Sequence, residues 1–188
     1  MELGFHEKRE LLRLARRTIA SALSGTPPEG SASLSGNLNR ESGAFVTLRE
    51  RGELRGCIGY VEAHSPLGIA VQEVSLKAAF EDPRFDPVTS KELRGLDIEI
   101  SVLSPLTEVE DFHEIVVGIH GLLVDAGYTR GLLLPHVASE FLWTREQFLD
   151  HTCAKAGLPP ETWRGGKVKI YRFTTETFSE RNIMSEEV

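Results

Sequence analysis

Residues 44–62, which read AFVTLRERGELRGCIGYVE, decide the fold because they have the pattern of a β-hairpin. Two runs of strand-forming residues, 44–50 and 54–62, flank a tight turn at Arg51-Gly52-Glu53. Antiparallel strands can be joined by such a short connection, whereas parallel strands need a long crossover. The segment therefore predicts an antiparallel sheet.

The second strand of this hairpin carries an unusual polar pair. If side chains alternate along it, Leu54 and Ile58 lie on the core face. Arg55 and Cys57 then share the opposite face, roughly 7 Å apart along the strand. A second alternating strand at 96–103 places Ile98, Ile100 and Val102 on one side. The pattern predicts one continuous core formed by the apolar faces of both strands.

Outward from the hairpin, helical and extended patterns alternate along the chain. Helices are predicted over 6–23, from the N-cap Ser65 and Pro66 to about 81, and from the capping box at Thr144 to about Ala156. A capping box at Thr89–Glu92 predicts one further helical turn. Further strands are predicted over 115–125, 131–134 and 167–174. This order favours an α+β fold with a mostly antiparallel β-sheet and flanking helices.

Length and composition fit a single domain over residues 1–188, with room for a smaller second lobe. Ser24–Ser42 is rich in Ser, Gly, Pro and Asn, which predicts a flexible loop within that domain. The N-terminus has no signal-peptide pattern, and no stretch approaches the ~18 apolar residues of a membrane helix. The chain is therefore expected in the cytoplasm, without membrane contact.

The charge and cysteine content exclude several classes of function. The formal net charge is −7, and no basic run is present, which argues against nucleic-acid binding. Cys57 and Cys153 are distant in sequence and form no CxxC pair, so both are expected to be reduced and unpaired. No metal site is predicted because no clustered set of ligands is present, and no cofactor motif is found.

The pair Arg55 and Cys57 has two interpretations. A guanidinium beside a thiol favours the thiolate and makes it more nucleophilic. Alternatively, Cys57 is a small buried hydrophobe and Arg55 is salt-bridged within the fold. Gly56 lies between Arg55 and Cys57, and Gly59 follows two residues after Cys57. Glycines inside a strand predict a bulge or the close approach of another group. Either interpretation makes this strand the candidate site.

His120 is a second candidate, because Gly118 and Gly121 leave space around its side chain. In the predicted strand over 115–125, Val117 and Ile119 share the face opposite His120. A histidine with open surroundings can transfer protons or contact a ligand. The alternative is an imidazole satisfied by a backbone carbonyl.

The remaining candidate site residues are Glu99 and the turn at 82–85. Glu99 faces away from the core and could meet Arg55, either as a structural ion pair or as a general base. Asp82, Arg84 and Phe85 follow a helix end, where they could line a binding cleft. They could equally fix the turn through an Asp–Arg pair.

The segment Leu54-Arg55-Gly56-Cys57-Ile58-Gly59 resembles the signature of the AMMECR-type domain family. The resemblance continues in the family's order through the segments DPRF at 82–85, IEISVLSP at 98–105, VGIHGL at 117–122, LLP at 133–135 and CAKAGL at 153–158, and through Trp163. These segments cover most of the chain.

The resemblance implies a two-lobed α+β fold with a cleft near the signature, but it assigns no reaction. Prokaryotic members of the family, including the A component of the AmmeMemoRadiSam system, are grouped with a Memo-type protein and a radical SAM enzyme. These are the protein partners that the resemblance implies.

Three functions are open. The first is an accessory module that binds a small molecule or a partner enzyme on the face of Arg55. The second is a thiol-dependent enzyme with Cys57 as nucleophile and His120 as base. The third is an acid–base enzyme that uses Glu99 or Asp82.

Overall fold

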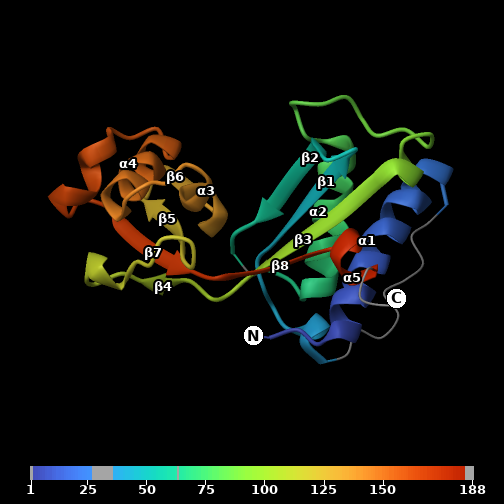
Figure 1. The fold of residues 1–188 in the computed structure, drawn as a ribbon, viewed down its shortest axis with the longest axis horizontal. Coiled ribbons are helices and arrows are strands. Elements are labelled where there is room, and N and C mark those ends of the chain that lie inside the picture. The colour runs from blue at the N-terminus through green and yellow to red at the C-terminus, as the bar shows by residue number, and fades with distance from the viewer. Residues whose placement is uncertain (1, 27–35, 63, 185–188) are drawn as a thin grey trace. The chain divides into compact units, whose positions relative to one another are not determined.

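The computed structural model describes residues 2–26, 36–62 and 64–184. The chain divides into two compact units, labelled by their elements in Figure 1. The first unit comprises the described residues up to Leu103 and those from Glu176 onward, and the second spans Ser104–Thr175. Each unit has its own hydrophobic core and its own four-stranded sheet.

The sheet of the first unit has the strand order β2-β1-β3-β8. Its strands are β1 (Ala44–Glu50), β2 (Glu53–Tyr60), β3 (Leu96–Leu103) and β8 (Thr175–Ser179). β1 pairs antiparallel with both β2 and β3, so the predicted hairpin is confirmed and β3 lies on its other side. The helices are α1 (Phe5–Ser24), α2 (Leu67–Phe80) and α5 (Glu180–Met184), with short 3₁₀ helices η1 (Gly36–Asn39) and η2 (Leu93–Gly95).

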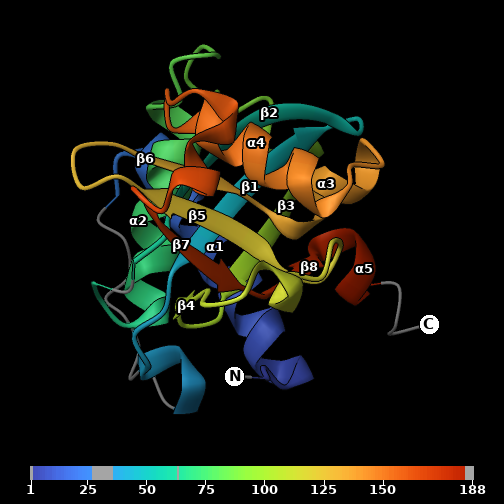
Figure 2. The same cartoon turned by 90° about the vertical axis from the view of Figure 1, so that its left-hand side faces the viewer.

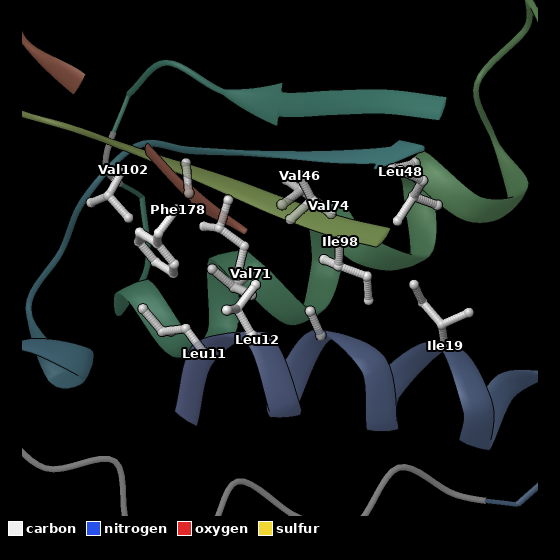
Figure 3. Close-up of a cluster of buried hydrophobic side chains, with 14 of the residues drawn as sticks. Leu11, Leu12, Ile19, Val46, Leu48, Val71, Val74, Ile98, Val102 and Phe178 are labelled. Atoms are coloured by element: carbon white, nitrogen blue, oxygen red, sulfur yellow. The ribbon is translucent and has the colours of Figure 1, made fainter. Parts of the chain in front are cut away.

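The core of this unit lies between one face of the sheet and the long helices. Figure 3 shows α1 below the strands, with Leu12 and Ile19 pointing towards the sheet and Val71 and Val74 of α2 packed among them. The predicted core residues Ile98, Ile100 and Val102 are buried there, and Ile58 packs against them. Alternation along the strands therefore placed these four side chains correctly.

The prediction that Leu54 lies in the core is wrong, because this residue is 37% exposed. β2 pairs Gly56 with Leu48 but Leu54 with Arg49, so Arg55 is an extra residue in the ladder. Such a β-bulge interrupts the alternation of side chains. Leu54 is thereby placed opposite the half-buried Arg49, and the alternation that predicted a shared face for Arg55 and Cys57 does not extend across the bulge.

The second unit builds a sheet with the order β4-β7-β5-β6. Its strands are β4 (Thr107–Glu108), β5 (Gly121–Asp125), β6 (Arg130–Leu133) and β7 (Lys169–Phe173), and all their pairings are antiparallel. The helices are α3 (Pro135–Glu140) and α4 (Arg145–Lys155), with 3₁₀ helices η3 (Phe112–Glu114) and η4 (Pro160–Gly165). In Figure 2, which faces this unit, α4 lies over β5 and β6.

The strand predicted over 115–125 is wrong in its first half. β5 begins only at Gly121, and residues 116–120 form a turn in which the His120 N–H donates to the Val116 carbonyl. Gly118 has a φ of 86°, a conformation that suits glycine. Ile119 is 57% exposed, so the apolar residues of this segment belong to an exposed turn and not to a buried strand face.

The predicted N-cap residue is correct for α4 and wrong for α2. Thr144 caps α4 with the predicted capping box, in which its side chain accepts the Gln147 N–H. At α2, however, the N-cap is Pro66 itself and not Ser65. Residues 27–35 of the predicted 24–42 loop lie outside the described part, while η1 at its end buries Leu38 in the core. Within the described residues, none of the helices has the length and apolarity needed to cross a membrane.

Candidate functional site

The edge strand β2 is held at Cys57 by the turn that follows α2. The backbone N–H of Cys57 donates to Asp82 Oδ2 at 2.9 Å, and Arg84 Nη2 donates to the Cys57 carbonyl at 3.3 Å. An edge strand otherwise presents unpaired backbone groups. The two side chains therefore replace a missing neighbouring strand at this one residue.

Asp82 and Arg84 also pair with each other. The guanidinium donates to both carboxylate oxygens, with Nε–Oδ1 at 2.9 Å and Nη2–Oδ2 at 2.7 Å. These bonds, led by the guanidinium and joined by the Cys57 N–H, hold the pKa of Asp82 far below its usual range. Asp82 therefore remains an anion at neutral pH and is a weak base. The guanidinium also lies 5.4 Å from the ring centre of Phe85.

Arg55 binds Glu92, not Glu99. Its Nε donates to Glu92 Oε1 at 2.8 Å, and the other carboxylate oxygen accepts the N–H and hydroxyl of Thr89 at 2.7 Å each. The pKa of Glu92 falls to about 2, chiefly because of the Arg55 bond and then because of Thr89. In the sheet, β1 separates β2 from β3, so a pair between Arg55 and Glu99 is not formed.

Both glycines of the signature accommodate a neighbour within the fold. A Cβ built on Gly56 would lie 2.2 Å from the carbonyl oxygen of Ala78, because β2 runs directly against the end of α2. A Cβ on Gly59 would lie 2.3 Å from the ring of Phe45 on the neighbouring strand. The close approach predicted from these glycines is therefore made by the chain itself.

Three polar residues form a row across the other face of this sheet. Thr47 in β1 lies between Cys57 in β2 and Glu99 in β3 by strand register. The Thr47 hydroxyl donates to the thiol of Cys57 at 3.2 Å. Since neighbouring strands are about 4.8 Å apart, Cys57 and Glu99 are separated by about 10 Å. This side of the sheet, opposite α1 and α2, is called the polar face below.

The polar face is half-exposed, and one of its charges has no internal partner. Thr47, Cys57 and Glu99 all retain partial contact with solvent. In the part of the chain that the structure describes, the carboxylate of Glu99 forms neither a hydrogen bond nor an ion pair. Cys153, by contrast, is fully buried, and burial raises the pKa of its thiol. Both cysteines are free thiols, but only Cys57 lies on an accessible surface.

His120 lies in the second unit, whereas Cys57 lies in the first. Its Nδ1 accepts the backbone N–H of Val116 at 3.0 Å, so the imidazole closes the 116–120 turn. Burial, together with Arg172, lowers the pKa of His120. Both effects favour the neutral form of its ring. Its Nδ1 is thus engaged by the backbone, and its Nε2 lies 3.4 Å from Arg172 Nη1.

The structure thus brings together Arg55, Cys57, Asp82 and Arg84 around β2. Sequence reasoning missed Thr47 and Glu92 as their partners. The predicted capping box at Thr89–Glu92 accounts for the bond between Glu92 and Thr89. Only the tertiary fold shows that Glu92 also binds Arg55. Among residues 2–26, 36–62 and 64–184, no group of three or more His, Cys, Asp or Glu side chains could hold a metal ion.

Comparisons with known proteins agree with this architecture. A family model described as AMMECR1 matches residues 12–178. A protein of Methanothermobacter thermautotrophicus is 42% identical over 188 residues, covering 95% of this chain and 96% of that protein. Protein MJ0810 of Methanocaldococcus jannaschii is 43% identical over 150 residues, covering 76% and 75%. The crystal structure of uncharacterized protein PH0010 from Pyrococcus horikoshii matches with a TM-score of 0.85 at 40% identity, covering 93% of this chain and 92% of that one.

Proposed function

The chain belongs to the AMMECR1 family, and we propose that it is an accessory module that binds a small molecule or a partner enzyme on its polar face. The partners favoured by family analogy are a Memo-type protein and a radical SAM enzyme, acting in the cytoplasm. The binding surface is centred on the row of Cys57, Thr47 and Glu99.

The observation that carries this proposal is the division between satisfied and unsatisfied groups. Arg55 is hydrogen-bonded to Glu92, and Asp82 is hydrogen-bonded to Arg84 and to the Cys57 N–H. These bonds fix β2 and its surroundings as a rigid support. Glu99, half-exposed and unpaired within the described residues, is left to meet a group from outside. A prepared surface with a free carboxylate suits binding, because little ordering is required when a ligand arrives.

The enzymatic alternatives have less support. Asp82 is a poor general base because its bonds stabilise the anion. A thiol enzyme needs a base within hydrogen-bond reach of the nucleophile. The group bonded to the thiol of Cys57 is the hydroxyl of Thr47, which is not basic at neutral pH. Glu99 remains the candidate general base. An acid–base enzyme that uses Glu99 would lose its activity in the variant Glu99→Gln.

The proposal can be tested by gentle purification of the tagged protein from its native cells, followed by mass spectrometry of bound proteins and small molecules. Wild type is compared with Glu99→Gln on the polar face and with Glu10→Gln, an exposed carboxylate on α1. We expect a bound species that Glu99→Gln loses and Glu10→Gln retains. Identical recovery from all three proteins, or no bound species in any, contradicts the proposal.

A further inference from the structure

The guanidinium of Arg172 lies between a carboxylate and an imidazole. Its Nε and Nη2 lie 3.2 and 3.1 Å from Oε2 of Glu114, so this carboxylate pairs with one edge of the guanidinium. The third nitrogen, Nη1, lies 3.4 Å from Nε2 of His120. By strand register Arg172 of β7 is opposite Leu122 of β5, two residues beyond His120. The sheet pairing therefore places the guanidinium beside the turn that leads into β5.

A neutral His120 ring carries its proton on Nε2. Nδ1 accepts the backbone N–H of Val116 at 3.0 Å, so its lone pair is engaged and it bears no hydrogen. A neutral imidazole has one N–H, which must then be at Nε2. Burial and then Arg172 lower the pKa of His120, while the Glu114 backbone acts in the opposite direction without cancelling them. The neutral ring therefore presents an N–H to Arg172, and not a lone pair.

The contact between His120 and Arg172 thus brings two donors together. One N–H cannot accept from another, so the approach of Nε2 and Nη1 is not a hydrogen bond. Among the described residues Nη1 has no acceptor, since its one hydrogen-bonding neighbour is this imidazole nitrogen. Two donors 3.4 Å apart can share one oxygen atom at about 2.9 Å from each. The pair is arranged to bind an acceptor from outside.

Both donors are accessible and held in position. The side chains of Arg172 and Glu114 are 30% and 39% exposed, and His120 is half-buried. The Val116 N–H fixes the imidazole, and the Glu114 carboxylate fixes the guanidinium. Donors that are already ordered lose little entropy when a ligand arrives.

The charges of this cluster favour a carboxylate as the bound group. Glu114 offsets the charge of Arg172, and the His120 ring is neutral, so the three side chains together have no net charge. A phosphate dianion would be repelled by Glu114 and by a chain of net charge −7. A carboxylate brings a single charge and accepts charge-assisted hydrogen bonds, which are about twice as strong as those of a neutral carbonyl.

The other charged groups around this turn are already bonded. Asp111 accepts the backbone N–H of His113 and lies 2.7 Å from its ring. Arg145 of α4 donates through Nε to the carbonyl of Ile115. Arg145 adds a positive charge along the turn, which favours an anion there.

We propose that His120 Nε2 and Arg172 Nη1 form a binding site for the carboxylate group of a small molecule. The carboxylate accepts the imidazole N–H and the guanidinium N–H, while Glu114 holds the guanidinium in place. All three side chains belong to the second unit, so this site goes beyond the binding role proposed for the polar face of the first.

The test titrates the full chain with sodium acetate at neutral pH and constant ionic strength. Nitrogen NMR follows the His120 ring and the Arg172 guanidinium, and the ring signals also identify the nitrogen that carries the proton. His120→Asn keeps an oxygen that can accept the Val116 N–H but removes the Nε2 donor. Arg172→Met removes the other donor and keeps an apolar side chain. The control is Lys169→Met, which removes a 64% exposed cation from the same strand.

We expect the free protein to carry the ring proton on Nε2, and acetate to shift both side-chain signals along one saturable curve. Affinity should fall at least about tenfold in His120→Asn, followed at Arg172, and in Arg172→Met, followed at His120, because each variant loses a hydrogen bond to a charged group. Lys169→Met should bind acetate as wild type does. Inorganic phosphate should bind wild type more weakly than acetate.

A ring proton on Nδ1, or no saturable shift with acetate, overturns the proposal. Equal affinity of wild type and either donor variant also overturns it, and the Arg172 variant provides this result even where His120→Asn does not fold. A comparable loss in Lys169→Met would show a general attraction of anions to β7 and no built site. Tighter binding of phosphate than of acetate would contradict the assignment to a carboxylate.

Discussion

The carboxylate of Asp82 accepts the backbone N–H of Cys57 at 2.9 Å, which joins the turn after α2 to the edge of the signature strand. Only 2% of the Asp82 side chain is exposed, while Arg84, its partner, is 54% exposed. The signature strand and the Asp82–Phe85 turn are therefore one structural feature, although 25 residues separate the bonded pair.

Replacing Asp82 should destabilise the first unit. Asp82→Ala leaves the Cys57 N–H without its acceptor and removes a charge-assisted pair, so we expect a loss of about 2–3 kcal/mol in unfolding free energy. Arg84→Ala should cost less, because the guanidinium is half in water. Urea titrations of both variants measure the difference. A loss below about 0.5 kcal/mol for Asp82→Ala would mean that solvent replaces the bond.

Stability should fall in acid because of Glu92. Its pKa is lowered from 4.5 to about 2 in the folded protein, so the folded state favours the carboxylate. The stabilisation is complete above the unfolded pKa of 4.5 and is lost as the pH falls towards 2. Asp82, whose pKa is lowered too, acts in the same direction.

The contribution of Glu92 can be isolated by unfolding titrations between pH 2 and 7. Glu92→Gln and Arg55→Met should each flatten the acid side of the stability profile, and the double variant should add little to either, because both remove one interaction. A wild-type slope in Glu92→Gln would show that other carboxylates govern acid unfolding.

Gly56 should not tolerate a side chain. The Cβ of Gly56→Ala would approach the Ala78 carbonyl to 2.2 Å, and backbone on both sides leaves little freedom to adjust. We expect a loss of about 1–3 kcal/mol or more. Gly165→Ala is the matched control, since a Cβ there meets nothing within 4 Å. Equal melting temperatures for Gly56→Ala and wild type would contradict the close packing of β2 against α2.

The two faces of the first sheet should respond differently to truncation. Ile100→Ala removes a side chain that is fully buried, so it should cost on the order of 2–4 kcal/mol. Leu54→Ala, on the exposed side of the bulge, should change stability by less than about 0.5 kcal/mol. Denaturant midpoints of the two variants provide the comparison, and a cost below about 1 kcal/mol for Ile100→Ala would reverse the assignment of faces.

Sequence reasoning predicted the elements whose pattern is local. The hairpin, α1, α2 and α4 follow from periodicity and from turn and capping residues, and the α+β class follows from their order. It failed where the backbone departs from regular geometry. The bulge at Arg55 reversed the side of Leu54, and the turn over 116–120 has the composition of a strand. Neither departure has a unique signature in the sequence.

Sequence reasoning named Arg55, Cys57 and Asp82 as candidates, but it named neither Thr47 nor Glu92 and did not predict which groups pair. Arg55, Cys57 and Asp82 stand out because glycines and a Pro-containing turn surround them. Which carboxylate Arg55 meets depends on the strand order, which places β1 between Arg55 and Glu99.

Selective alkylation of Cys57 tests most directly the claim that the polar face binds and does not catalyse. Cys57 is half-exposed and Cys153 fully buried, so a bulky maleimide should modify Cys57 alone in the native protein. Mass spectrometry of native complexes then compares the alkylated protein with Cys57→Ser. We predict that alkylation reduces recovery of the bound partner or compound at least about tenfold, while Cys57→Ser retains it. Undiminished recovery after alkylation, or a bound compound that wild type converts and Cys57→Ser does not, would contradict the account.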